Sequence, residues 1–299
     1  MKKMLLGAHM PVAGGLESAA KFGQAVGCSA IQIFTKSNRQ WAAKAITDTE
    51  ADQFKAAIKA CNINYVMVHA CYLINICSPE TDILHKSTTA LATELKRCSQ
   101  LGIRDLVLHP GARKTAELSS TIKQAAAAIN LALSQSPQDT RILLETMAGQ
   151  GSSVGSNFEE LAQILALVRD QDRVGICLDT CHIFASGLNF DTIKDYEQLW
   201  RDFDKTIGRS KLGAIHLNDS QKGLGSKVDR HENIGKGKIG ISGFEYLMND
   251  PLLINLPKIM ETPKMDLADD QQNMAILLEL LTVENQKSLF GTNLESYLR

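Results

Sequence analysis

The sequence predicts an α/β protein in which eight parallel strands alternate with eight helices and close into a (β/α)8 barrel, the TIM barrel fold. Runs of about five apolar residues, typical of strands buried on both faces, recur along the chain. Helix-like segments separate these runs, as a parallel sheet requires. Six runs end in a histidine or a carboxylate residue, at the point where a barrel strand leaves the core.

The expected strands cover residues 4–8, 30–34, 65–69, 105–109, 141–145, 174–179, 212–216 and 257–261. The six with a polar end are YVMVH to His69, DLVLH to His109, RILLE to Glu145, GICLD to Asp179, GAIH to His216 and PKIME to Glu261. An open, doubly wound sheet is the competing architecture. The barrel is favoured because no glycine-rich fingerprint follows the first strand.

Helix signals lie between the strands. The segment KQAAAAINLAL at about 123–133 consists of strong helix formers, and a last helix is expected from about Leu267 to Leu281. Ser-Pro-Glu at 78–80 and the capping-box patterns at 156–159 and 242–245 are expected helix starts. Gly102 and Gly208 are expected to follow helix ends. These elements form one domain over residues 1–299, since no linker or composition break interrupts them.

Composition limits the class of protein. The 299 residues carry 32 basic and 33 acidic side chains, so bulk charge argues weakly against a nucleic-acid binder but permits a local basic groove. The seven cysteines form no CxxC pair, which favours a reduced, cytoplasmic protein. No secretory segment or bilayer-length apolar stretch is evident, so no membrane association is expected.

Nine side chains are candidates for one site at the carboxyl ends of the strands, where barrel enzymes place their catalytic groups. His182 follows Asp179 by three positions, and a short turn after the strand can direct both side chains to the same end of the barrel. Asp229 and His231 are two apart, so extended backbone would put both on one side. The full set is His69, His109, Glu145, Asp179, His182, His216, Asp229, His231 and Glu261.

Imidazole and carboxylate ligands together suit zinc, and also manganese or iron. A lone strand-end histidine is usually a hydrogen-bonded core or rim residue, but recurrence on six strands weakens that explanation. Nine ligands exceed the needs of one ion, so a cluster of two or three is predicted, suited to phosphoryl displacement. His85 is expected at the surface of a helix. His9 closes the first strand and could contact a metal ligand without binding the metal itself.

Three loops add a second signal. Residues 34–41, FTKSNRQW, are basic and aromatic; residues 72–75, YLIN, follow the third strand; and the segment after His216 is rich in glycine and lysine. Flexible basic loops with exposed aromatic side chains can grip phosphates and wedge between bases. Charge alone would favour ordinary solvated barrel loops.

Seven short segments contain or flank the candidate residues. They are HACYLIN (69–75), HPG (109–111), LETMAGQG (144–151), LDTCH (178–182), HLND (216–219), GSKVDRH (225–231) and ETP (261–263). Together these segments resemble the endonuclease IV family of apurinic/apyrimidinic endonucleases. The resemblance runs in order over roughly residues 4–282.

The resemblance implies three zinc ions, with manganese as a possible substitute. His69 and His109 would hold the first ion, and Glu145 would bridge it to the second. The other ligand sets implied are Asp179, His216 and Glu261 for the second ion, and His182, Asp229 and His231 for the third. Glu145 and Glu261 are the expected catalytic residues.

The implied reaction is hydrolysis of the phosphodiester 5′ to an abasic site in double-stranded DNA, leaving a 3′-hydroxyl and a 5′-deoxyribose phosphate. This is a step of base excision repair, and trimming of blocked 3′ ends is also implied. The enzyme would act at the nucleoid without an obligate protein partner. Arg39, Tyr72 and Leu73 match residues that enter the gap left by the damaged nucleotide. Lys36, Lys227 and Arg230 are expected to meet phosphates.

Two other functions remain open at this point. A metal-dependent sugar isomerase or epimerase on a related barrel would also use strand-end ligands, but it would need fewer ions and no basic loops. A non-catalytic binder of damaged DNA should have lost some of the nine ligands, and this sequence keeps all of them.

Overall fold

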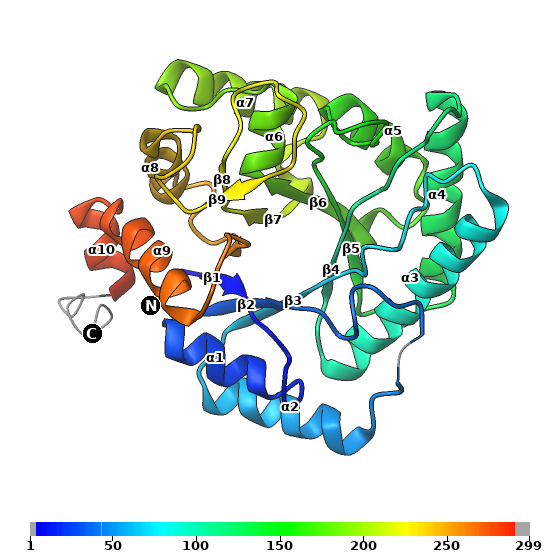
Figure 1. The fold of residues 1–299 in the computed structure, drawn as a ribbon, viewed down its shortest axis with the longest axis horizontal. Helices are drawn as coiled ribbons and strands as arrows, with labels where there is room; N and C mark the ends of the chain where they lie inside the picture. Colours follow the sequence, from blue (N-terminus) through cyan, green and yellow to red (C-terminus); the bar gives the residue numbers. More distant parts are fainter. Residues whose placement is uncertain (1–3, 43, 291–299) are drawn as a thin grey trace.

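The closed barrel predicted from the sequence is confirmed in the computed structural model, which describes residues 4–42 and 44–290 (Figure 1). Eight parallel strands are hydrogen-bonded in the circular order β1-β10-β7-β6-β5-β4-β3-β2. They are β1 (Leu6–His9), β2 (Ala30–Ile33), β3 (Tyr65–His69), β4 (Asp105–Leu108), β5 (Arg141–Glu145), β6 (Val174–Asp179), β7 (Leu212–His216) and β10 (Lys258–Met260). Each coincides with an expected strand to within two residues.

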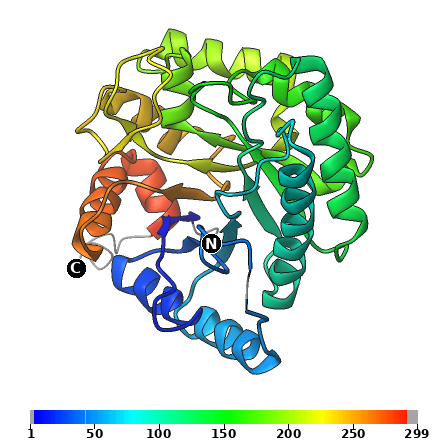
Figure 2. The ribbon, with the colours of Figure 1, turned by 45° about the vertical axis from the view of Figure 1, so that its right-hand side comes forward.

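Helices surround the barrel on its outer face (Figure 2). They are α1 (Ser18–Val26), α2 (Asp48–Ala60), α3 (Thr81–Leu101), α4 (Leu118–Ser134), α5 (Phe158–Leu167), α6 (Thr180–Ser186), α7 (Ile193–Thr206), α8 (Ile241–Asn249), α9 (Leu267–Glu279) and α10 (Val283–Phe290). Short 3-10 turns η1 (Gln171–Arg173) and η2 (Arg209–Lys211) precede β6 and β7. No helix in the described part of the chain is long and apolar enough to span a bilayer.

The helix ends agree with the sequence better than the helix starts do. Gly102, with a φ of +73°, ends α3 as expected. The expected start at Ser78 is wrong, because α3 begins at Thr81 and Ser78 Oγ instead accepts from a nearby backbone N–H in the preceding turn. The cap of α5 is Asn157, one residue after the expected serine, and α8 begins after Gly240 without a side-chain cap.

The strands meet inside the barrel in two successive layers. The lower layer is apolar and fully buried, and its members are Ala30, Met67, Val107, Leu143, Cys177, Ala214 and Ile259. Side chains two residues apart on a strand point to the same face. The next layer toward the carboxyl ends therefore consists of the residues two positions later, which are polar. Counting β1, it holds His9, Gln32, His69, His109, Glu145, Asp179, His216 and Glu261.

The opposite end of the barrel is closed by polar groups of a different kind. Arg141 donates to both carboxylate oxygens of Asp105, at 2.6 and 3.0 Å, and the Tyr65 hydroxyl donates to the same carboxylate. Lys258 is fully buried, and its ammonium donates to the backbone oxygen of Leu253 at 2.6 Å. These contacts satisfy buried charges at the end of the barrel away from the candidate site.

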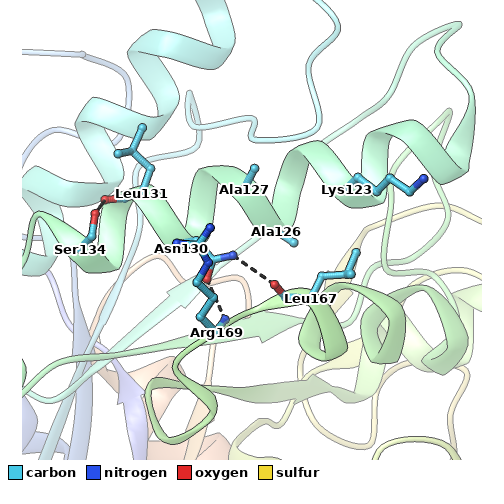
Figure 3. A pocket seen from close by; sticks show the side chains of 8 residues that line it. All are labelled: Lys123, Ala126, Ala127, Asn130, Leu131, Ser134, Leu167 and Arg169. Carbon is cyan, nitrogen blue, oxygen red and sulfur yellow. Dashed lines mark hydrogen bonds between the residues drawn. The ribbon is translucent and has the colours of Figure 1, made fainter.

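The helical wall carries a shallow groove between α4 and the end of α5 (Figure 3). The Asn130 amide donates to the Leu167 backbone oxygen at 3.1 Å and accepts from the Arg169 N–H at 2.8 Å. The rest of the lining shown there comes from α4 and consists of Lys123, Ala126, Ala127, Leu131 and Ser134, together with the Leu167 side chain at the end of α5. None of its lining residues belongs to the candidate ligand groups at the strand ends.

Lys258 predicts a specific pH dependence of stability. Burial lowers its pKa to about 7, well below the value in an unfolded chain. Between these two pKa values the unfolded state binds more protons, so the free energy of unfolding should rise with pH above about 7. The Lys258→Met variant should lack this rise. Urea unfolding at pH 7 and pH 9 should show the wild type gaining about 2 kcal/mol relative to the variant; equal pH responses would contradict it.

Candidate metal centre

The nine predicted site residues converge at the carboxyl ends of the strands. Their ligand atoms form groups in which every member lies within 4.8 Å of the others. Three of these groups have the membership that the resemblance implied. They are His69, His109 and Glu145; Glu145, Asp179, His216 and Glu261; and His182, Asp229 and His231.

The first group joins β3, β4 and β5. His69 donates from Nδ1 to the backbone oxygen of Ala70 at 2.8 Å. Since a carbonyl can only accept, the proton is on Nδ1, and Nε2 is free to bind a cation. This Nε2 lies 3.3 Å from Glu145 Oε2, and His109 Nε2 lies 3.0 Å from the same oxygen.

The second group shares Glu145 with the first. His216 Nδ1 lies 3.0 Å from Glu145 Oε1, 3.3 Å from Glu261 Oε2 and 3.7 Å from an oxygen of Asp179. The two oxygens of Glu145 therefore face two different groups of ligands. Glu145 thus belongs to both ligand groups.

The third group is built on a helix and a loop. Asp179, at the end of β6, caps α6 by accepting from the His182 N–H at 2.8 Å, which explains the three-residue spacing. His182 donates from Nδ1 to the Thr146 backbone oxygen at 2.7 Å, leaving Nε2 3.2 Å from Asp229. His231 Nε2 lies 3.3 Å from the other oxygen of Asp229.

A short antiparallel pair that the sequence did not predict holds this loop. Strand β8 (Asp219–Ser220) pairs with β9 (His231–Glu232). The buried carboxylate of Asp219 also accepts from the N–H groups of Gly235, Gly237 and Ile239, at 2.9 to 3.1 Å. Asp219 therefore folds the long segment after β7 back onto the barrel and presents His231.

Charge and hydrogen bonding both fit a bound cation. Burial alone would raise the pKa of Glu145, but His109 and His216 hold it well below its usual value. Burial would lower the pKa of His182, yet Asp179 and Asp229 raise it well above 6.5. Among the described residues, the buried Nε2 atoms of His182 and His231 make no hydrogen bond of acceptable geometry. Nitrogen and carboxylate donors in this arrangement suit zinc.

Several of the expected DNA contacts are exposed beside the site. Arg39 lies at the surface of the loop after β2. The Tyr72 side chain is 55% exposed, and its ring packs edge-on against Phe34 and His69. Lys227 and Arg230 are also exposed on the loop after β7. These four side chains are therefore accessible to a partner.

Two other expected contacts are oriented differently. The Lys36 side chain is only 4% exposed, and its ammonium donates to the backbone oxygen of Gln40 at 2.7 Å and lies 3.8 Å from the buried Glu94. In this structure the Lys36 ammonium therefore supports its own loop, and its contact with a phosphate stays a prediction. Leu73 is half-buried against the core and does not project as Tyr72 does.

Three residues outside the nine predicted ligands also lie beside the site. His9 Nδ1 lies 3.3 Å from Glu261, so its expected contact with a ligand is present. Cys181 lies near Asp179 and His231, but burial raises the pKa of its thiol to about 12. Gln32 was missed because AIQIF has no polar end. Its pairing with His9 in the β1–β2 register is the signal that could have found it.

Comparisons with known proteins agree with this geometry. The model of the xylose isomerase-like TIM barrel family matches residues 20–282. Probable endonuclease 4 of Trichlorobacter lovleyi is 43% identical over 277 residues, which are 92% of this chain and 99% of that protein. Probable endonuclease 4 of Chloroflexus aurantiacus is 44% identical over 277 residues, or 92% and 97% of the two chains.

Solved structures give the same relationship. Endonuclease IV from Thermus thermophilus matches with a TM-score of 0.82 and 32% identity, covering 92% of this chain and 98% of that one. A D-tagatose 3-epimerase-like protein matches with a TM-score of 0.70 at 17% identity, which shows a common fold alone. With its fold, its ligand groups and these full-length relatives, the chain belongs to the endonuclease 4 family of xylose isomerase-like TIM barrels.

Proposed function

We propose that this protein is a zinc-dependent apurinic/apyrimidinic endonuclease of base excision repair. It would hydrolyse the phosphodiester 5′ to an abasic site, leave a 3′-hydroxyl and a 5′-deoxyribose phosphate, and trim blocked 3′ ends. The observation that carries the proposal is the gathering of nine nitrogen and oxygen ligands into three groups, two of which share Glu145. Relatives named endonuclease 4 support the same activity.

The ligand groups would hold the cations and keep the reacting groups in place. Zinc held there would supply Lewis acidity and make water a nucleophile near neutral pH. Glu145 and Glu261 remain ionised, because nearby histidines lower their pKa values despite burial. They can therefore bind cations and accept hydrogen bonds from the attacking water. The hydrogen-bonded histidines keep their ligand nitrogens pointed at one shared space, so little reorganisation is needed during reaction.

The exposed rim supplies recognition of the substrate. Tyr72 presents an aromatic edge directly above His69, and Arg39 lies on the neighbouring loop. Such side chains can occupy the gap when a nucleotide leaves the helix. An abasic nucleotide has no base to unstack, so its extrusion costs less than that of an intact nucleotide. Lys227 and Arg230 would neutralise phosphates on the other side of the opening.

The two rival functions explain less of the structure. A sugar isomerase of this fold has no evident need for the third group of His182, Asp229 and His231, which lies outside the barrel strands. A non-catalytic binder would have no reason to keep nine ligands with their hydrogen-bonded partners.

The first prediction concerns the reaction itself. Zinc-loaded protein should cut a labelled duplex at a single abasic site without added magnesium, because its own ligands hold the required cations. Prolonged incubation with a strong chelator should abolish cleavage, and zinc should restore it. Denaturing electrophoresis with end-group analysis would identify the 3′-hydroxyl product. An abasic strand that stays intact under zinc-replete conditions would refute the proposal, and a matched duplex without the lesion is the control.

The second prediction concerns the two catalytic carboxylates. Glu145→Gln and Glu261→Gln should each lower kcat on the order of 10³-fold or more, because a neutral amide cannot balance the clustered cations. Far-ultraviolet circular dichroism should stay close to that of the wild type. Glu197→Gln on the exposed face of α7 is the matched control and should retain full activity. Near-native turnover in either site variant would argue against the assigned cluster.

The third prediction concerns the basic rim. Binding of an abasic duplex should weaken with rising salt despite the near-neutral net charge, and Arg230→Ala should reduce the slope of log Kd against log salt by about one. Arg201→Ala, on exposed α7, should leave the slope unchanged. Fluorescence anisotropy in the inactive Glu145→Gln background would measure both. A wild-type affinity that does not respond to salt would remove the phosphate contacts from the proposal.

A further inference from the structure

Two members of the polar barrel layer, His9 and Gln32, have no assigned part in cation binding. Gln32, in the middle of β2, is fully buried among the histidines and carboxylates. It is the only amide in that layer. A buried amide without hydrogen-bond partners would destabilise the fold, so the groups that bond to Gln32 indicate its role.

Gln32 connects three of its neighbours. Its Nε2 lies 2.5 Å from Glu261 Oε1 and 2.9 Å from His9 Nδ1. Its Oε1 lies 2.9 Å from His216 Nε2. One amide thus touches both the carboxylate and the imidazole that face each other across the second ligand group.

The chemistry of these partners sets the orientation of the amide. An ionised carboxylate only accepts hydrogen bonds, so the amide nitrogen must face Glu261. The amide oxygen is then left for His216, whose Nε2 must carry the proton. His216 Nδ1 consequently presents its lone pair to the space between Glu145 and Glu261.

His216 differs in this respect from the other oriented histidines. His69, His182 and His231 each donate their one ring N–H, at Nδ1, to a backbone oxygen, which a substitution does not remove. His216 depends on a side chain. The same amide also holds Glu261 Oε1, so that Oε2 is the oxygen turned toward His216.

We propose that Gln32 is a positioning residue for the second cation site, where it selects the Nδ1-binding tautomer of His216 and aims Glu261. This inference rests on the proposed function, because it assumes that the group of Glu145, Asp179, His216 and Glu261 holds a zinc ion. Partners of this kind, behind a metal ligand, contribute about 10- to 100-fold to metal affinity. Loss of Gln32 should therefore weaken one ion selectively.

The test compares Gln32→Met with Gln32→Glu and with Gln124→Met. The methionine removes both hydrogen-bonding ends of the amide, whereas the glutamate keeps an acceptor for His216 and loses the donor to Glu261. Gln124, on α4, donates to two backbone oxygens on the outer wall, so Gln124→Met controls for loss of a structural amide. Zinc stoichiometry and stepwise affinities would be measured by chelator competition. Histidine nitrogen chemical shifts of the zinc-loaded proteins would report the His216 tautomer.

Wild type and Gln124→Met should bind three zinc ions with equal affinities. Gln32→Met should bind one of the three about 10- to 100-fold more weakly, and its His216 Nε2 proton signal should be lost. Gln32→Glu should retain that signal, since it still provides an acceptor. Unchanged affinities and tautomer in Gln32→Met would overturn the inference while leaving the proposed function intact. A wild type that binds no zinc would overturn both.

Discussion

The closed register of a parallel barrel is the constraint on which the candidate site depends. Because the strands run in one direction and close on themselves, the residue at a given height on each strand faces the same interior space. The apolar ring that includes Met67 and Leu143 fills the barrel, and a step of two residues along each strand leads to the polar layer. A one-residue slip of any of the six strands that carry candidate ligands would replace a ligand with an outward-facing residue. The register of these six strands therefore specifies the cluster more strictly than any single motif does.

Burying the charged groups of the polar layer costs stability, and a bound cation would offset that cost. Glu145 is completely buried and contacts histidines from three strands, so its charge is balanced only by neighbouring imidazoles in the described structure. Burying ionisable groups together in this way is expensive for a protein that gains nothing but stability from them. Glu145 cannot be exchanged for an apolar residue without separating two ligand groups. Asp179 likewise has two parts: one oxygen of its carboxylate caps α6, and the other faces His216 in the cluster.

The sequence was sufficient for the parts of the structure that follow from periodicity. The strands and the first six ligands follow from apolar runs that end in polar residues, and burial of each run sets its position. Gln32 escaped prediction because it interrupts a run and does not end one, so only the register with His9 identifies its height. The internal ion pair of Lys36 could not be predicted, because composition shows a charge but not the buried Glu94 that attracts it. The β8–β9 pair depends on Asp219 organising a glycine-rich loop, a long-range effect that local propensity does not contain.

The third ligand group differs from the others because it is not carried by the barrel strands. His182 lies on α6, and Asp229 and His231 lie on the loop after β7, so a cation there would tie this loop to the rigid core. Arg230 stands between the two loop ligands and faces solvent, as alternation on extended backbone requires. Three consecutive residues would thus combine the proposed cation binding with the expected contact to phosphate. Displacing the loop would remove both at once, so occupancy of the third site and grip on DNA should depend on each other. The position of the loop therefore matters for both functions. The buried Asp219 fixes that position, because its hydrogen bonds hold the loop against the barrel.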